Sequence, residues 1–433
     1  MKRRDFLATA TAAAGLPYLV PSGVLAQPGK KGANEKLVFG HIGVGGMGNY
    51  HLTDMKARAD RGELHIAAVC DVDDHRLAAA SKTAGPQADT YRDYRHVIER
   101  KDIDGVVIAT PDHWHAVQTV HAAECGKHVY VEKPACCTIE EGKAMVAAAK
   151  KNKIAVQIGS QGRSQPECHA AATFLRNGML GKVSKVTCWH YANPVGGTEP
   201  DSPCPPELDW DLWLGPMRWR PYNKAYCPGT FRWFLESGGG QIRDRGAHVM
   251  SCALYLMDAD SQGGPVGIEA TGTAPTKGLW DCPVDMEVTY TFKNPDWVLT
   301  WSQPGKAPEK EEGVGHNGYG AVYHGDQDTL VLFGGDGGTW TQKKAREFKV
   351  PAGGREIYKS PGHKEDWFDG IRTGRKTIMN VEAGVATANL TVLGNIAYVL
   401  GRKIQWDPVK QEIVGDDSAR RMMTRPQRFP YHL

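Results

Sequence analysis

The chain has 433 residues, with 52 Lys or Arg against 49 Asp or Glu and a formal net charge of +3. This balance, with no basic cluster beyond the N-terminus, argues against nucleic acid as the main partner, and the length predicts two domains rather than one. Ten cysteines are present, but no CxxC or Cys/His spacing indicates zinc, so we predict no metal site. Only Cys204 and Cys227 are candidates for a disulfide.

The N-terminus has the pattern of an export signal. Lys2-Arg3-Arg4-Asp5-Phe6-Leu7 is a twin-arginine sequence, an Ala-rich apolar stretch follows, and Val24-Leu25-Ala26 offers small residues for cleavage. The apolar stretch is shorter than the ~20 residues that a bilayer requires, so we expect no membrane span. We predict a signal peptide over residues 1–26 and a periplasmic or otherwise exported protein. A basic N-terminus leading into an amphipathic helix is the alternative.

An apolar run of strand length, residues 36–42, ends at a cluster of glycines followed by a helix-compatible segment, residues 49–59. In a dinucleotide-binding turn the first glycine makes the bend, the second lets the main chain approach a pyrophosphate and the third packs helix on strand. The phosphates bind free N–H groups at the start of the helix. The candidate contacts are Gly43, Gly45, Gly46, Met47 and Gly48. With 50 glycines in the chain, this spacing needs support from elsewhere.

The next apolar strand, residues 64–70, ends at Asp71, about twenty residues past the last glycine, where this fold places an acid on the adenosine ribose. A carboxylate there repels a 2′-phosphate, which favours NAD over NADP. Asp73 and Asp74 could share this role or cap the helix that follows. Arg76 could stack on the adenine or lie in solvent.

Two further strands, residues 104–109 and 128–131, also end in polar residues. Ligands bind at the carboxyl ends of parallel strands, so these ends are candidate contacts. An alternative for the first is a helix cap by Asp112 with two surface histidines. A Lys at the end of a buried strand needs an anionic or polar partner, which indicates a site at the second. The candidate cofactor contacts here are Thr110, Pro111, His113, His115, Glu132 and Lys133.

A helix over residues 139–151 and a strand over 154–158 complete a regular β/α alternation, which predicts a parallel sheet with helices on both faces. Gln161 follows the last strand and is a further candidate cofactor contact. We place an α/β Rossmann domain at 35–160 and a second domain at 161–433.

The second domain mixes helices with strands of alternating polarity, which suit a sheet with one buried face. Residues 193–234 are loop-like, and their many Trp and Tyr residues could stack on a sugar ring or form local core. The tail, residues 413–433, is polar and Arg-rich, and we expect it to pack over a neighbour or subunit. The expected helices span residues 166–177, 246–256, 363–371 and 382–400, and the expected strands span 183–191, 286–292, 298–302 and 329–333.

Together these motifs resemble the Gfo/Idh/MocA oxidoreductases. The resemblance is carried by residues 44–48, 71–73, 109–115, 132–134, 208–216 and 395–408, of which the last two segments are similar to an exported subgroup. It implies an NAD-binding Rossmann domain followed by an α+β C-terminal domain with a large, mostly antiparallel sheet. It also implies a carbohydrate substrate and assembly as a homodimer or homotetramer.

Asp244 and His248 are four residues apart, so one pocket can receive both. Alone they are more often a helix cap and a surface histidine. The family's sugar dehydrogenases place such a pair opposite a catalytic Lys, which implies that Lys133, Asp244 and His248 are catalytic here; a further family Asp is Ser251 in this chain. His248 would be the general base, because an imidazole can take up a proton near neutral pH. Lys133 would stabilise alkoxide character on the reacting oxygen, and Asp244 would orient one of these two side chains or balance its charge.

The resulting expectation is an NAD-dependent enzyme that oxidises a hydroxyl of a sugar or glycoside. Free NAD is scarce outside the cytoplasm, so we expect a tightly held cofactor. An NAD-dependent glycoside hydrolase, which oxidises C3 transiently and eliminates the aglycone, is the alternative. A binding protein that keeps NAD only structurally would be expected to lose Lys133 or His248, and both are present.

Overall fold

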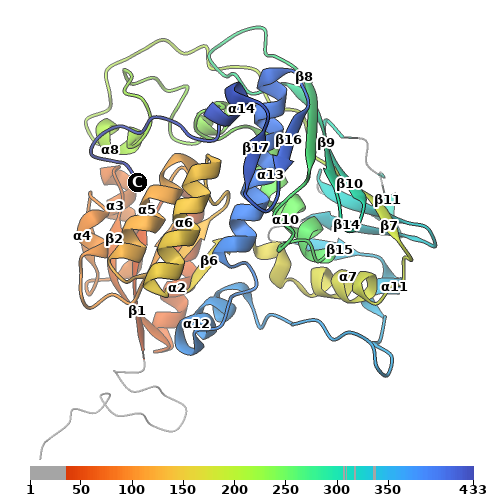
Figure 1. Ribbon diagram of the computed structural model, residues 1–433. Helices are drawn as coiled ribbons and strands as arrows, with labels where there is room; N and C mark the ends of the chain where they lie inside the picture. Colours follow the sequence, from red (N-terminus) through yellow and green to blue (C-terminus); the bar gives the residue numbers. More distant parts are fainter. Residues whose placement is uncertain (1–35, 306–307, 309, 316–317, 335–337) are drawn as a thin grey trace, which may run out of the picture.

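The structure is a computed structural model of the protein, and it describes residues 36–433 except 306–307, 309, 316–317 and 335–337. The predicted signal peptide, residues 1–26, lies outside the described residues and stays a prediction. Figure 1 shows two helix-covered sheets side by side, the first built from residues up to 160 and the second from the rest of the chain.

The β/α alternation of the first domain folds into a six-stranded parallel sheet with the order β3-β2-β1-β4-β5-β6. Its strands are β1 (Leu37–Ile42), β2 (Leu64–Cys70), β3 (Asp89–Tyr91), β4 (Gly105–Ile108), β5 (His128–Glu132) and β6 (Val156–Gly159). Its helices are α2 (Gly46–Asp60), α3 (Asp74–Ala84), α4 (Arg95–Ile98), α5 (Asp112–Glu124) and α6 (Ile139–Asn152). The strand order reverses between β1 and β4, so a crevice for a ligand is expected at their carboxyl ends.

The second domain is built on a nine-stranded sheet with the order β15-β14-β13-β7-β10-β9-β8-β16-β17. The β7–β10 pair is parallel and the other pairs are antiparallel, as expected for a mostly antiparallel sheet. The strands are β7 (Val183–Trp189), β8 (Gly267–Thr273), β9 (Asp285–Phe292), β10 (Trp297–Gln303), β13 (Gly320–Gly325), β14 (Thr329–Gly334), β15 (Thr339–Thr341), β16 (Ile404–Asp407) and β17 (Glu412–Val414). A separate pair is formed by β11 (Lys310–Glu311) and β12 (Val314–Gly315).

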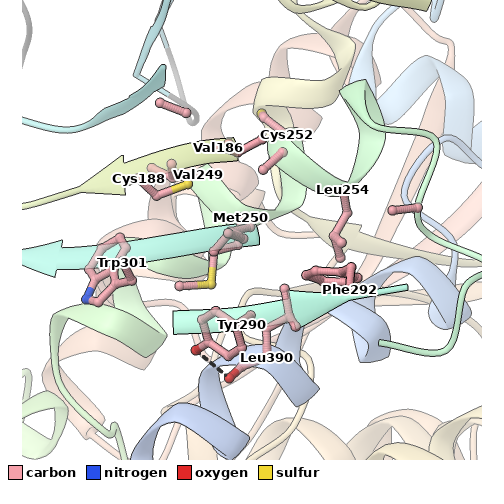
Figure 2. Packing of buried hydrophobic residues seen from close by; sticks show 14 of the residues in the cluster. Val186, Cys188, Val249, Met250, Cys252, Leu254, Tyr290, Phe292, Trp301 and Leu390 are labelled. Atoms are coloured by element: carbon pink, nitrogen blue, oxygen red, sulfur yellow. Dashed lines mark hydrogen bonds between the residues drawn. The ribbon is translucent and has the colours of Figure 1, made fainter. Parts of the chain in front are cut away.

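The helices of the second part of the chain are η2 (Gln161–Ser164), α7 (Pro166–Arg176), α8 (Trp210–Leu214), η3 (Thr230–Trp233), α9 (Gln241–Asp244), α10 (Gly246–Leu256), α11 (Lys343–Arg346), α12 (His363–Thr373), α13 (Val381–Leu400) and α14 (Asp417–Arg421). Some of them cover one face of this sheet, and others, such as α8 and α12, pack against the first domain. Figure 2 shows Met250 and Leu254 of α10 packed against Tyr290, Phe292 and Trp301 of the sheet. The buried Tyr290 hydroxyl donates to Leu390 O of α13 at 2.8 Å, so the core leaves that polar group satisfied.

Helix α13 ties the two domains together. It is long and apolar enough to cross a membrane, but 72% of its most apolar window is buried inside the protein, which is typical of a core helix. Just before it, Met379 O accepts a hydrogen bond from Ile158 N of β6 at 2.8 Å. A Cβ on Gly384 would lie 2.2 Å from Ile158 Cγ1, so the helix lies directly against the first sheet. The two domains therefore have a close-packed joint.

The structure bears on three expectations about the second domain. The segment 193–234 is loop-like as expected, but it contains α8 and η3 and packs on the first domain. The Arg-rich tail packs on its own chain, where Arg425 and Arg428 bond to residues of both domains, and its contact with a neighbour or subunit stays a prediction. Cys204 and Cys227, the candidates for a disulfide, are both free thiols.

Candidate active site

The glycine turn after β1 leaves no room for a side chain at its first and last glycines, Gly43 and Gly48. Gly43 has φ +78°, and a Cβ there would lie 2.7 Å from Thr110 N. A Cβ on Gly48 would lie 1.8 Å from Gly43 O, so the last glycine lets α2 pack against the turn. Gly46 has no described atom within 4 Å of a Cβ position and begins α2. The first N–H groups of α2 have no partner within the helix, so they can bind an anion.

Asp71 is fixed at the end of β2 by two backbone groups. Its Oδ2 accepts from Val44 N at 2.8 Å and its Oδ1 accepts from Asp73 N at 3.1 Å. Burial raises the pKa of Asp71, and these N–H groups oppose the rise. Asp73 caps α3 by accepting from Arg76 N at 3.0 Å, so the capping alternative holds for it. The Arg76 side chain lies across the turn, next to Gly45.

These residues line a groove of about 330 Å³ at the switch point of the first sheet. The predicted cofactor contacts that line it are Gly43, Gly45, Gly46, Met47, Asp71, Arg76, Thr110, Pro111, His115, Glu132 and Lys133. A cradle without Cβ atoms, free N–H groups and an acid at the ribose position together fit NAD. The opposite wall, which sequence reasoning missed, comes from the second domain and includes Leu212, Trp213, Phe231 and Arg232.

The histidines after β4 are buried, so their alternative placement on the surface is wrong. His113 has no exposed surface, and its Nε2 donates to Trp213 O at 2.9 Å. Burial lowers the pKa of His113 to about 3, so it is a neutral packing residue and does not line the groove. The ring nitrogens of His115 lie 2.9 Å from Thr110 O and 2.8 Å from Pro134 O, which joins two loops at the groove.

Asp112 begins α5 and lines the groove, but its side chain makes no capping hydrogen bond. The capping alternative is therefore wrong for this residue. Burial raises the pKa of Asp112, and the charges of His115, Arg232 and Arg243 oppose the rise. Its carboxyl group lines the groove, whereas the sequence analysis predicted only a helix cap for this residue.

A second cavity of about 1160 Å³ lies between the domains and adjoins the first. Met47, Glu132, Lys133 and Arg232 line both cavities. Lys133 therefore lies where a bound nucleotide and a bound second ligand meet. Further residues that line the larger cavity are Tyr50, His51, Gln161, His190, Tyr191, Trp233, Asp244, Arg245, His248 and Tyr319.

Lys133 and Asp244 form an ion pair across the domain boundary. Their side chains are only 11% and 13% exposed, and Lys133 Nζ also donates to Asp244 O at 3.1 Å. Arg232 Nε and Arg245 Nε lie 3.4 and 3.8 Å from the Asp244 carboxylate. Burial favours the neutral acid, but the charges of Lys133 and the two arginines hold the pKa of Asp244 below its usual range. The polar partner expected for Lys133 is therefore Asp244, from the second domain.

Glu132 is held by a residue that sequence reasoning missed. His51 Nε2 on α2 donates to Glu132 Oε1 at 2.7 Å, and Gln161 Nε2 donates to the same oxygen at 2.9 Å. Burial opposes ionisation, but His51 and Lys133 lower the pKa of Glu132 to about 2, so the carboxylate is ionised. Gln161 thus supports Glu132 and lines the larger cavity rather than the nucleotide groove. A single histidine within a helical segment does not indicate from the sequence that His51 binds Glu132.

His248 lies on α10 and lines the larger cavity, as Lys133 and Asp244 do. Asp244 ends the short helix α9, and Arg245 separates it from α10. Ser251 is buried elsewhere: its Oγ accepts from Arg163 Nε at 2.8 Å. The structure thus brings together the three predicted catalytic residues and leaves Ser251 out. In the described part of the chain, no group of three or more His, Cys, Asp or Glu side chains could hold a metal ion.

Comparison with protein families identifies both domains. Residues 37–160 match the model of the Gfo/Idh/MocA oxidoreductase family described as an NAD-binding Rossmann fold. Residues 172–294 and 280–433 match the model of that family's C-terminal alpha/beta domain. The chain belongs to the Gfo/Idh/MocA oxidoreductase family. Its first domain is therefore an NAD-binding Rossmann domain, in agreement with the groove.

Individual relatives match over part of their length. The rhizopine catabolism protein MocA of Rhizobium meliloti is 35% identical over 36% of this chain and 48% of that protein. Levoglucosan dehydrogenase of Pseudarthrobacter phenanthrenivorans is 29% identical over 44% of this chain and 42% of that protein. The chain thus spans about half the length of the curated relatives it matches.

Among solved structures, the WlbA dehydrogenase from Bordetella pertussis, in complex with NADH and UDP-GlcNAcA, superposes with a TM-score of 0.61. The match covers 86% of this chain and 99% of that one at 18% sequence identity. At this identity the likeness establishes the two-domain fold alone.

Proposed function

We propose that this protein oxidises a hydroxyl group of a sugar or glycoside, with NAD as the hydride acceptor. The observation that carries the proposal is the position of Lys133, which lines both the nucleotide groove and the larger cavity and pairs with Asp244. An ammonium group at this junction can reach a substrate oxygen next to the redox centre.

The chain's own residues supply binding and proton transfer. The N–H groups at the start of α2 hold the pyrophosphate and Asp71 holds the adenosine ribose. When bound, NAD supplies the acceptor for a hydride from the carbinol carbon. Lys133 donates a hydrogen bond to the reacting oxygen and stabilises its alkoxide character. His248 takes the hydroxyl proton, and Asp244, which its cationic neighbours keep ionised, holds the Lys133 ammonium group in place.

The larger cavity favours a carbohydrate. Tyr50 and Tyr191 line it with side chains that are 61% and 59% exposed, and Trp233 and Tyr319 line it as well. Aromatic faces bind the apolar faces of sugar rings, while carboxylates and imidazoles around them bind hydroxyl groups. One relative is named levoglucosan dehydrogenase, which agrees with this class of substrate.

We further propose that the protein works outside the cytoplasm with a resident cofactor. The twin-arginine sequence Lys2-Arg3-Arg4-Asp5-Phe6-Leu7 supports export of the folded protein. A dehydrogenase that released NADH there would stop after one turnover, so a second substrate or an external acceptor must reoxidise it. Assembly as a homodimer or homotetramer remains a proposal, which light scattering on the purified protein tests.

The test is to purify the full chain without added cofactor, measure its NAD(H) content, and screen sugars and aryl glycosides for ketosugar, NADH and released aglycone. Stable ketosugar supports oxidation. Aglycone release without net NADH would instead establish the redox-neutral glycoside hydrolase. Retention of NAD without either product would indicate a binding protein.

A further inference from the structure

One wall of the nucleotide groove comes from residues 204–233 of the second domain, a segment that we call the cover. Among its residues that line the groove are Leu212 and Trp213 of α8 and Phe231 and Arg232 of η3. The glycine turn and Asp71 form the wall from the first domain. A nucleotide in the groove therefore lies between the first domain and the cover.

The cover docks on the first domain at both flanks of the groove. At the β2–α3 turn, Asp209 N donates to Val72 O at 3.0 Å and Asp74 N donates to Glu207 O at 3.0 Å. At the start of α5, Trp114 Nε1 donates to Leu212 O at 3.0 Å. His113 bonds to the next carbonyl of α8, as described above. The cover is thus hydrogen-bonded to the first domain on both sides of the groove, at the β2–α3 turn and at the start of α5.

The C-terminal residues 425–433, which we call the clasp, bind the outer side of α8. Arg428 forms an ion pair with Asp211, and its Nη2 donates to Asp211 O at 2.7 Å. Arg428 Nε donates to Gly215 O at 3.0 Å, and Tyr431 Oη donates to Asp211 Oδ2 at 3.1 Å. One guanidinium therefore bonds to both the carboxylate and the carbonyl group of Asp211 in α8, and to the carbonyl group of Gly215 just after α8.

The clasp is itself anchored on the first domain. Arg425 Nε donates to Glu141 Oε1 of α6 at 2.9 Å, and Arg425 Nη2 donates to His113 O at 3.0 Å. The Tyr431 ring packs against Trp114 with centroids 5.2 Å apart. Figure 1 shows the dark-blue C-terminal chain ending beside α8 and α5. The clasp therefore spans from α6 to the cover and contacts α8 on the side away from the groove lining.

We propose that the clasp retains the cofactor: it holds the cover over bound NAD, and the nucleotide dissociates only when Arg428 and Tyr431 release Asp211. The inference rests on the proposed function in one respect, that NAD occupies the groove. It explains why an Arg-rich tail packs on its own chain, and it gives an exported dehydrogenase a physical means to keep a cofactor that its surroundings do not supply.

The test compares cofactor release from the full-length wild-type protein, Arg428→Ala and Asp211→Asn. Each protein is loaded with NADH and mixed with excess NAD, and the loss of bound-NADH fluorescence gives the dissociation rate. We expect Arg428→Ala to release NADH at least ~10-fold faster than wild type, since all its charge-assisted hydrogen bonds to α8 and Gly215 are lost. Asp211→Asn should release NADH faster than wild type by a smaller factor, because it loses only the charge of the carboxylate. NAD(H) content after desalting should fall in parallel.

Arg421→Ala is the matched control, because Arg421 is an exposed residue of the same tail at the end of α14. It should release NADH at the wild-type rate. Asp211→Asn is included because it should fold normally: the Asp211 side chain is 54% exposed, and Asn has nearly the same shape. Release at the wild-type rate from either clasp variant overturns the clasp and leaves the proposed function standing. A wild-type protein that binds no NADH overturns both.

Discussion

Replacement of Lys133 by Met tests its catalytic role, because its effects on turnover, NADH binding and stability can be measured separately. The substitution keeps an unbranched side chain, one atom shorter, but removes the ammonium group that pairs with Asp244 at the junction of the two cavities. The pyrophosphate and ribose positions lie elsewhere, at the glycine turn and Asp71, so NADH should still bind. Turnover should fall, because nothing then stabilises charge on the reacting oxygen.

The structure sets the size of both effects. Loss of one partner from a buried ion pair costs ~3–5 kcal/mol when the other charge is left alone. Asp244 keeps Arg232 and Arg245 within 4 Å, so we expect a smaller loss of about 2 kcal/mol in the free energy of unfolding. Removal of a preorganised donor to a developing oxyanion costs ~10²–10³ in kcat. Denaturant unfolding, NADH titration and initial rates measure the three quantities.

Lys127→Met is the matched control. Lys127 is also buried in the first domain, and its Nζ donates to Ile103 O at 2.8 Å, but it lines neither cavity. This variant should lose stability with kcat unchanged. Wild-type kcat in Lys133→Met, in a protein that is folded and binds NADH, would refute the role of Lys133 as the group that stabilises the alkoxide.

Four further variants test the base, the glycine turn and a buried histidine. His248→Ala should lower kcat by ~10²–10⁴ with NADH still bound; retained turnover in steady-state assays would exclude it as the base. Gly48→Ala should destabilise the fold by ~1–3 kcal/mol because a Cβ meets Gly43 O, whereas Gly46→Ala should unfold at the wild-type temperature. Burial lowers the pKa of His41 from 6.5 to about 3, so at pH 5 protonation favours the unfolded chain by about 2 kcal/mol. Between pH 7.5 and 5, His41→Leu should therefore lose less stability than wild type in denaturant titrations, and an equal loss would contradict the burial argument.

Sequence reasoning recovered the first domain because its signals are local. Apolar runs that end at Gly43, Asp71 and Glu132 mark parallel strands, and the same strand ends carry the contacts of the groove. Strand β3 and helix α4 gave no signal of comparable strength, since they are three and four residues long. The prediction that Lys133, Asp244 and His248 are catalytic came from the resemblance, because spacing alone favoured a helix cap and a surface histidine, and the structure places all three at one cavity.

The missed features depend on contacts between distant parts of the chain. His113 follows a strand end like its neighbours, but the carbonyl of Trp213, a hundred residues later, turns it away from the groove. The partner of Arg428 is likewise on α8, over two hundred residues before it. A polar, Arg-rich tail has the composition of a solvated segment, and only the folded structure brings these carboxylates and carbonyl groups within its reach.

Asp71 limits how the cofactor preference of this protein could be re-engineered. An exchange of NAD for NADP is commonly sought by removing the acid that faces the ribose, so that a 2′-phosphate is no longer repelled. Here both oxygens of that acid also accept backbone N–H groups, one from Val44 inside the glycine turn and one from Asp73. A neutral, shorter residue at position 71 would remove the hydrogen bond from Val44 N that tethers the glycine turn. The choice between NAD and NADP therefore cannot be changed at this position without affecting the shape of the phosphate site. Arg76, at the edge of the groove, offers a site where selectivity can be altered with the tether intact.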